Sequence, residues 1–324
     1  DNRLGVAEAP PAVISMFLGT ELTEILEALE QGSNYEGIEK KDMEIGVHTL
    51  PKFPRDNTDR NRTSPFAFTG NKFEFRMPGS NMSISCPNMI LNTITADVLM
   101  EFADKLEAAD DFNAELNSLI RETIKNHKRI IFNGNGYTEE WLAEAKERGL
   151  LNLPTTPDAL PYFIREENVE LFAKHHIFTR TELFSRYEIL LENYCKVVHI
   201  EANTMLEMAK KDIMPAAMKY IKFISETVNS LKSAIPSAAI APEVELLEKM
   251  SNFAAEFYKI SKKLESDISV IKEKSVLLEK ACYLRDVIIK DMDALRVIAD
   301  SMEEIMPKEY YPYPNYSDIL FSVI

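Results

Sequence analysis

The sequence predicts an α+β fold, in which a turn-rich front part with β-strands precedes a bundle of long helices. All ten glycines of the 324-residue chain lie at or before Gly149, so the last 175 residues contain none. Because hairpin turns usually need glycine where φ is positive, a glycine-free stretch of this length favours helices. Apolar residues in that stretch recur every three or four positions, as on one face of a helix. The front, in contrast, contains a hairpin signal at Gly70.

The hairpin signal is the dipeptide Gly70-Asn71, which separates the segments 66–69 and 72–76. Two residues of this type between alternating apolar segments are typical of a tight β-hairpin. The resulting register brings four phenylalanines onto one face, where we expect them to join the core: Phe66 opposite Phe75, and Phe68 opposite Phe73.

Side-chain alternation then places Lys72, Glu74 and Arg76 on the opposite face, beside Ala67. A carboxylate between two cations, next to a small residue, leaves room for a bulky anion. The segment 52–76 supports this reading, since it carries six basic and three acidic residues. The alternative is a solvated strand face with surface ion pairs, which are common and weak.

Helices follow the hairpin. Apolar spacing predicts a helix from Cys86 to about His127 and a short one from Thr138 to Arg148. Between them, the glycine-containing segment 132–136 lacks a third glycine and the Lys-Ser/Thr pair of phosphate-binding loops. We therefore interpret it as a plain turn.

The back of the chain opens with a capping box, in which Thr179 precedes Glu182 by three residues. The long helix that follows should be disturbed at Pro215, because proline lacks a backbone donor and crowds the preceding turn. We expect it to end near Ser230, with residues 233–242 linking it to further long helices. Three antiparallel helices are the simplest packing.

This pattern predicts three parts. Residues 1–178 form the front with its connecting helices, residues 179–306 form the helical bundle, and residues 307–324 form a tail. The tail contains the apolar run Ile319-Leu320-Phe321, which we expect to pack on the front part.

Composition excludes several classes of protein. With 52 acidic and 37 basic side chains the net charge is -15, which argues against nucleic acid as a general partner. No stretch is long and apolar enough to predict a membrane span, and the three cysteines form no C-x-x-C pair, so we expect a cytoplasmic protein. The chain begins at Asp1 without methionine, and we expect a fragment that is inactive alone.

Three segments carry a family resemblance. The opening Arg-Leu-Gly-Val-Ala-Glu-Ala-Pro-Pro of residues 3–11 and the segment Asp-Arg-Asn-Arg-Thr-Ser-Pro of residues 59–65 precede Asn-Lys-Phe-Glu-Phe-Arg at 71–76. In this order they resemble the carboxyl-terminal catalytic half of glutamine synthetase. The amino-acid sequence of residues 59–80, the helical extension and the tail Tyr-Pro-Tyr-Pro-Asn-Tyr at 311–316 are most similar to the large type III enzymes.

The resemblance implies a role for each matching residue. Glu74 resembles a ligand of the divalent ion that holds the ATP γ-phosphate, which suits Mg²⁺ or Mn²⁺. Arg62 and Arg76 resemble the arginines that neutralise the transferring phosphoryl group. Arg3 resembles the arginine that binds glutamate, and Glu8 the flap carboxylate that helps take a proton from ammonium.

Two positions of the same segment are less informative. Lys72 is a weak candidate for an ATP contact. The commoner family members have a second arginine where this sequence has Ala67, so no role is transferred to that position.

The implied function is ATP-dependent formation of glutamine from glutamate and ammonium through γ-glutamyl phosphate. The implied fold is part of an antiparallel-sheet catalytic domain followed by a long-helix bundle, and the implied assembly is a homo-oligomeric ring. Two alternatives stay open at this point. One is a non-catalytic helical assembly module, and the other is a different carboxylate-amine ligase with the same Glu-x-Arg strand.

Overall fold

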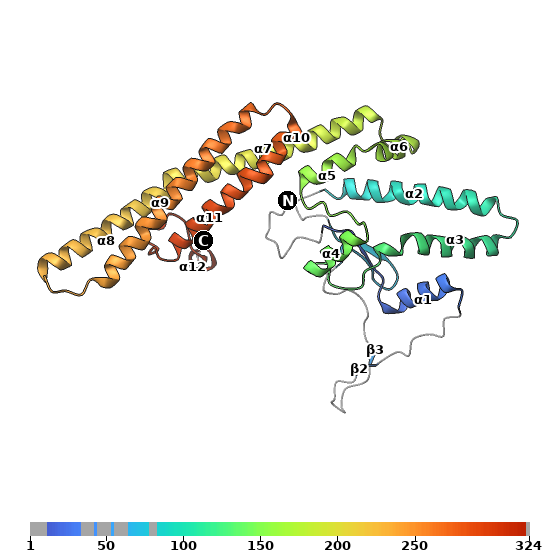
Figure 1. Cartoon of the computed structure of the whole chain (residues 1–324), viewed down its shortest axis with the longest axis horizontal. Coiled ribbons are helices and arrows are strands. Elements are labelled where there is room, and N and C mark those ends of the chain that lie inside the picture. The colour runs from blue at the N-terminus through green and yellow to red at the C-terminus, as the bar shows by residue number, and fades with distance from the viewer. Residues whose placement is uncertain (1–11, 34–41, 44–52, 55–63, 78–82, 322–324) are drawn as a thin grey trace. The chain divides into compact units, whose positions relative to one another are not determined.

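The computed structural model describes residues 12–33, 42–43, 53–54, 64–77 and 83–321. It divides into two compact units, with the boundary between Leu183 and Phe184. Helices dominate both units and the strands are short, so the predicted α+β class is confirmed (Figure 1). Within the described part of the chain, no helix is long and apolar enough to cross a membrane.

The first unit contains a small mixed sheet. Its strands are β1 (Met16–Phe17), β4 (Phe66–Phe68) and β5 (Phe73–Phe75), in the order β1-β4-β5. Strand β4 is antiparallel to β5, as the hairpin signal predicted, and parallel to β1. A separate antiparallel pair joins β2 (Asp42–Met43) to β3 (Phe53–Pro54). Strand β1 was not predicted, because two residues are too few to show an alternation of apolar and polar side chains.

The predicted hairpin register is confirmed. Phe66 pairs with Phe75 and Phe68 with Phe73, and Ala67 pairs with Glu74 between them. Gly70 has a φ of 94°, and the Thr69 amide donates to the Lys72 carbonyl at 2.9 Å. Glycine at the first central position is what a type II′ hairpin turn requires.

The expectation that the phenylalanine face joins the core was wrong. Phe73 is 47% exposed, whereas Ala67 on the other face is fully buried. The rings instead pack on one another, with centroids 5.5 Å apart for Phe66 and Phe73 and 5.2 Å apart for Phe68 and Phe73. The ring contacts within the hairpin thus replace the core contacts that alternation had led us to expect.

Helices make up most of the first unit. Helix α1 (Thr20–Gln31) packs on α3 (Phe112–His127), and α2 (Ser85–Glu107) packs on α3 and on α6 (Glu166–Lys174) (Figure 1). The helix predicted across 86–127 is therefore two helices. The chain turns before Asp111, whose carboxylate accepts from the amides of Asn113 and Ala114 and so begins α3 as an N-cap.

Two shorter helices complete this unit, α4 (Glu139–Glu147) and α5 (Thr156–Phe163). Helix α4 begins after Thr138, as predicted, and its Trp141 is buried against Phe132 with ring centroids 3.7 Å apart. A second cluster of buried side chains consists of Val169, Phe172 and Leu183.

The second unit consists of long helices. Helix α7 (Arg180–Met208) continues through the π-helical turn η3 (Ala209–Ile213) into α8 (Met214–Ala234). The predicted capping box is confirmed, since the Thr179 amide donates to Glu182 at 2.9 Å and the Glu182 amide donates to Thr179 Oγ1 at 3.3 Å. The predicted disturbance at Pro215 takes the form of the π-helical turn directly before it.

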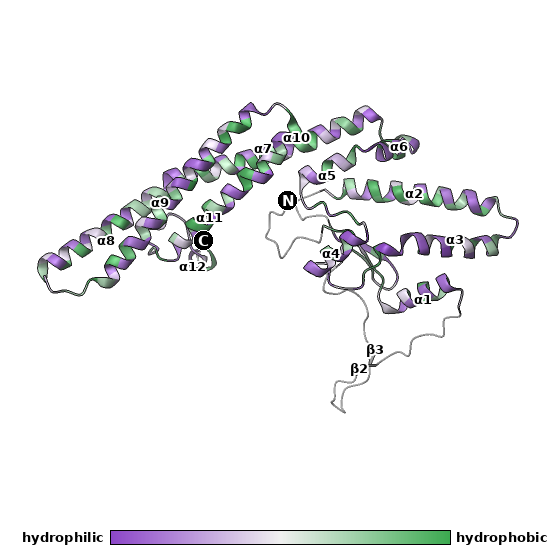
Figure 2. Ribbon diagram, viewed as in Figure 1, coloured by the Kyte–Doolittle hydropathy of each residue, from purple (hydrophilic) through white to green (hydrophobic). Residues whose placement is uncertain are grey.

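Two further lengths of helix complete the second unit. Helix α9 (Ala241–Val270) packs on α8 and ends in a short 3₁₀ turn, η4 (Ile271–Glu273). Helix α10 (Leu277–Tyr283) continues through η5 (Leu284–Ile288) into α11 (Ile289–Glu303), which packs on α9. The alternation of apolar and polar faces along these helices is visible in Figure 2.

The chain then forms a tail ending in α12 (Tyr316–Phe321). Within the second unit, Tyr310 packs against Tyr220 and Phe223 of α8, with ring centroids 5.1 and 5.6 Å away. Contact of the tail with the front part stays a prediction.

Candidate functional site: the charged face of the β5 strand

Strand β5 and its flanks position three of the residues predicted for the site. Lys72 precedes the strand, Glu74 lies at its centre and Arg76 follows it. The Glu74 carboxylate contacts both cations. Its Oε1 lies 3.3 Å from Lys72 Nζ, and its Oε2 accepts from Arg76 Nε at 3.2 Å and from Arg76 Nη2 at 3.1 Å. Alternation along the strand therefore brings these side chains together as predicted.

The two cations keep Glu74 ionised. Hydrogen bonds from Arg76 and then Lys72 lower the pKa of the Glu74 carboxyl below its usual value, and slight desolvation only partly opposes them. At neutral pH the site thus carries one carboxylate between two positive charges. Its net charge of +1 suits an anionic ligand such as a phosphate group.

Accessibility differs among the three side chains. The side chain of Arg76 is only 16% exposed, whereas those of Glu74 and Lys72 are 37% and 65% exposed. Arg76 is thus held in place deeper in the unit, and its backbone amide also donates to the Pro65 carbonyl at 2.8 Å. Glu74 keeps access to solvent and Lys72 extends into it.

The chemistry of Glu74 fits a hard divalent cation. Mg²⁺ prefers oxygen ligands, and it usually takes one or two carboxylates while phosphate oxygens and water fill the other positions. An ionised and accessible carboxylate can supply one such ligand. Among the residues that the structure describes, no group of three or more histidine, cysteine, aspartate or glutamate side chains could hold a metal ion. A single carboxylate occupies only one or two of the positions around such an ion.

The remaining predicted site residues, Arg3, Glu8 and Arg62, lie outside the described residues. Their roles stay predictions.

The structure adds two polar residues that the sequence analysis did not single out. Thr69 Oγ1 lies 3.5 Å from Glu74 Oε1, at the limit of a hydrogen bond. In the predicted plain turn, Asn133 Oδ1 accepts from the amides of Leu18 and Gly19, both at 3.0 Å. Its Nδ2 donates to Thr23 Oγ1 at 2.9 Å. An asparagine beside glycines was the available signal, and its function is to join the turn to the start of α1.

Comparison with known proteins points to one family. A family model described as the glutamine synthetase C-terminal domain matches residues 115–232. A glutamine synthetase of Butyrivibrio fibrisolvens is 43% identical over 328 residues, which cover 100% of this chain and 46% of that protein. A glutamine synthetase of Bacteroides fragilis (strain YCH46) is 32% identical, covering 99% of this chain and 46% of its own length.

These matches show that the chain is related to the glutamine synthetase family along its whole length. The relationship includes the type 3 branch, since a Type-3 glutamine synthetase of Dictyostelium discoideum is 36% identical over 99% of this chain and 45% of its own length. The chain spans about half the length of the curated relatives it matches.

Proposed function

We propose that this chain forms part of a glutamate-ammonia ligase, which makes glutamine from glutamate and ammonium at the expense of ATP. The observation that carries the proposal is the Lys72-Glu74-Arg76 face of β5, in a chain related along its whole length to glutamine synthetases. In this reaction ATP phosphorylates the side-chain carboxylate of glutamate, and ammonia then displaces phosphate from γ-glutamyl phosphate.

Glu74 and Arg76 have different roles in stabilising the charge of the phosphoryl group. Glu74 contributes one oxygen ligand to a Mg²⁺ or Mn²⁺ ion, which, when bound, would neutralise charge on the γ-phosphate of ATP. Arg76 keeps Glu74 ionised and adds its own positive charge beside the transferring phosphoryl group. Arg62 supplies a second guanidinium for the same group. Charge stabilisation of this kind is the main contribution that a protein makes to phosphoryl transfer.

Other residues act on the substrates. Lys72 extends into solvent and is the candidate for an ATP contact. Arg3 binds a carboxylate of glutamate through a bidentate pair of hydrogen bonds, for which a planar guanidinium is better suited than an ammonium group. Glu8 closes over the site, takes a proton from ammonium and excludes water from the acyl phosphate.

The proposal also covers the division into domains, the assembly and the location of the enzyme. We expect residues 1–178 to belong to a catalytic domain, 179–306 to a helical extension and 307–324 to a tail. We also expect the enzyme to be a homo-oligomeric ring in the cytoplasm, where a reducing environment suits a chain with an odd number of cysteines.

Product analysis tests the proposal. The complete natural protein is supplied with ATP, Mg²⁺ and glutamate, together with ammonium or with methylamine or ethylamine as the competing amine. We expect glutamine with ammonium, and one phosphate released per glutamine formed. A preference for another amine would indicate a different carboxylate-amine ligase. Absence of both ATP binding and product would support a helical assembly module and contradict the proposal.

A further inference from the structure

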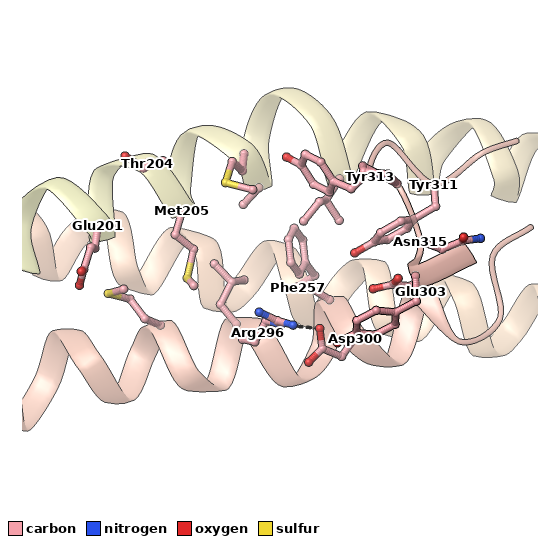
Figure 3. Close-up of a pocket in the computed structure, with 18 of the residues that line it drawn as sticks. Glu201, Thr204, Met205, Phe257, Arg296, Asp300, Glu303, Tyr311, Tyr313 and Asn315 are labelled. Atoms are coloured by element: carbon pink, nitrogen blue, oxygen red, sulfur yellow. Dashed lines mark hydrogen bonds and ion pairs between the residues drawn. The ribbon is translucent and has the colours of Figure 1, made fainter. Parts of the chain in front are cut away.

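The second unit contains a pocket formed by its own helices and tail. It lies between α7 with η3, α11 and the tail, and its volume is about 700 Å³ (Figure 3). Its floor is part of the helix core, because Ala209, Phe257 and Leu295 are each only 1% exposed. Pockets of this size are typical of small-molecule sites.

The tail that forms one wall is anchored at several points. The Tyr313 hydroxyl donates to Asp212 Oδ2 at 2.9 Å, and Tyr310 packs on α8. Asn315 and Asp318 cap one another, since each backbone amide donates to the side chain of the other at 3.0 Å. A wall held in this way needs little ordering when a ligand binds, which lowers the entropic cost of binding.

Most of the lining is apolar and adaptable. Met205, Met208 and Met292 contribute thioether side chains to the lining, and Tyr311 and Tyr313 contribute aromatic rings. Methionine is flexible and polarizable, so it fits ligands of irregular shape and contacts aromatic rings favourably. The lining therefore suits a flat apolar or aromatic group.

The charges around the pocket have one dominant sign. Three carboxylates line it, those of Glu201, Asp300 and Glu303, whereas Arg296 is its single basic residue. Arg296 donates to Asp300 across one turn of α11, as the dashed line in Figure 3 shows. The lining thus has a net charge of -2. Burial and the neighbouring Glu303 raise the pKa of Tyr311 to about 12, so its ring stays neutral and electron-rich.

We propose that this pocket binds a small amphipathic organic cation, with an apolar or aromatic body and one protonated amine. The body lies against the methionines and Phe257, and the amine lies near Glu201 or Glu303. Anions of the same shape are repelled by the net negative lining. The inference is independent of the proposed ligase activity, since the pocket residues belong to the helical unit alone.

Calorimetric titration of the full chain with three probes of similar shape tests whether the pocket prefers a cation. The probes are tryptamine, which is a cation, tryptophol, which is neutral, and indolepropionate, which is an anion. We expect tryptamine to bind with submillimolar affinity and roughly tenfold more tightly than tryptophol, because a charge-assisted hydrogen bond replaces a neutral one. Indolepropionate should not bind measurably.

Variants connect the affinity to the pocket. Replacing both Glu201→Gln and Glu303→Gln should weaken tryptamine roughly tenfold and leave tryptophol unchanged. The control pair Glu188→Gln and Glu304→Gln removes the same charge from exposed positions of the same unit and should change neither. Met205→Trp places a bulkier side chain in the lining and should weaken binding of both tryptamine and tryptophol.

Circular dichroism confirms that each variant keeps its helices. The proposal is overturned if tryptamine does not bind with submillimolar affinity. Tighter binding of the neutral or anionic probe, or unchanged tryptamine affinity in Met205→Trp, would overturn it equally.

Discussion

At the scale of single residues, the charged face of β5 follows from alternation along one strand. The sequence predicted the pairing of Ala67 with Glu74 and the shared face of Lys72, Glu74 and Arg76, and the structure has both. It could not predict burial. Ala67 is covered and Phe73 is not, because burial depends on β1 and on neighbours distant in sequence, which alternation does not encode.

A second charged cluster makes stability depend on pH. Asp97 of α2 accepts hydrogen bonds from Lys174 Nζ at 2.5 Å and from His175 Nε2 at 2.8 Å. Both hydrogen bonds lower the pKa of Asp97, and the one from Lys174 has the larger effect. A carboxyl whose folded pKa is lowered stabilises the protein above its unfolded pKa near 3.8, and this contribution disappears as pH falls through the folded pKa.

Asp97→Asn should therefore lower the thermal unfolding temperature at pH 7, and the difference from the parent should shrink below about pH 4. Glu101→Gln, one turn further along α2, serves as the control, because Glu101 forms only an exposed ion pair with Lys105. An Asp97→Asn deficit of equal size at pH 7 and pH 3 would assign the effect to packing instead of charge.

Glu8 provides a test of the second chemical step. If Glu8 accepts a proton from ammonium, Glu8→Gln should reduce glutamine formation on the order of a hundredfold and leave ATP binding intact, because the amide keeps the size but cannot take the proton. Steady-state synthesis and nucleotide titration measure the two effects separately. Unchanged synthesis at saturating ATP would remove Glu8 from the mechanism.

At the scale of elements, the apolar spacing predicted α9 better than α7. In α9 Met250, Phe257 and Leu264, which recur every seven residues on one face, are fully buried. In α7 Leu190 is 45% exposed, while its neighbour Leu191 is buried. Helix α7 carries apolar residues on more than one face, so a period of 3.6 residues could not select the buried side.

Substitutions of buried residues in α9 should lower the free energy of unfolding of the second unit. Leu264→Ala should destabilise that unit by about 2 to 5 kcal/mol, because it removes buried methyl groups and leaves a cavity. Met218→Ala removes a side chain that is 62% exposed and should cost less than about 1 kcal/mol. Urea unfolding followed by circular dichroism gives both values. Similar losses for the two variants would contradict the packing described for α9.

At the scale of the whole molecule, helix α7 begins in the first unit and continues into the second. Its Leu183 belongs to the buried cluster of the first unit with Val169 and Phe172, whereas Leu191 is buried further along the same helix. Unfolding of either unit should therefore loosen a helix on which the other depends. In the sequence, only the capping box at Thr179 marked where this helix begins.

We predict that the two units unfold in one calorimetric transition. Deleting residues 310–324 should lower its midpoint, because Tyr310 no longer packs on Tyr220 and Tyr313 no longer bonds Asp212. Two separate transitions, both unaffected by the deletion, would show that the helical part folds independently.

Glu74 is the proposed metal ligand, and Glu74→Ala in the complete natural protein tests that role. Glu74 lies on a partly exposed strand face, so the variant should fold normally. If the ligand contributes about 3 kcal/mol to the transition state, glutamine synthesis should fall on the order of a hundredfold, and added Mg²⁺ or Mn²⁺ should restore part of it. The control Glu101→Ala removes an exposed ion pair and should leave synthesis unchanged. Near-normal synthesis by a folded Glu74→Ala enzyme would contradict the account.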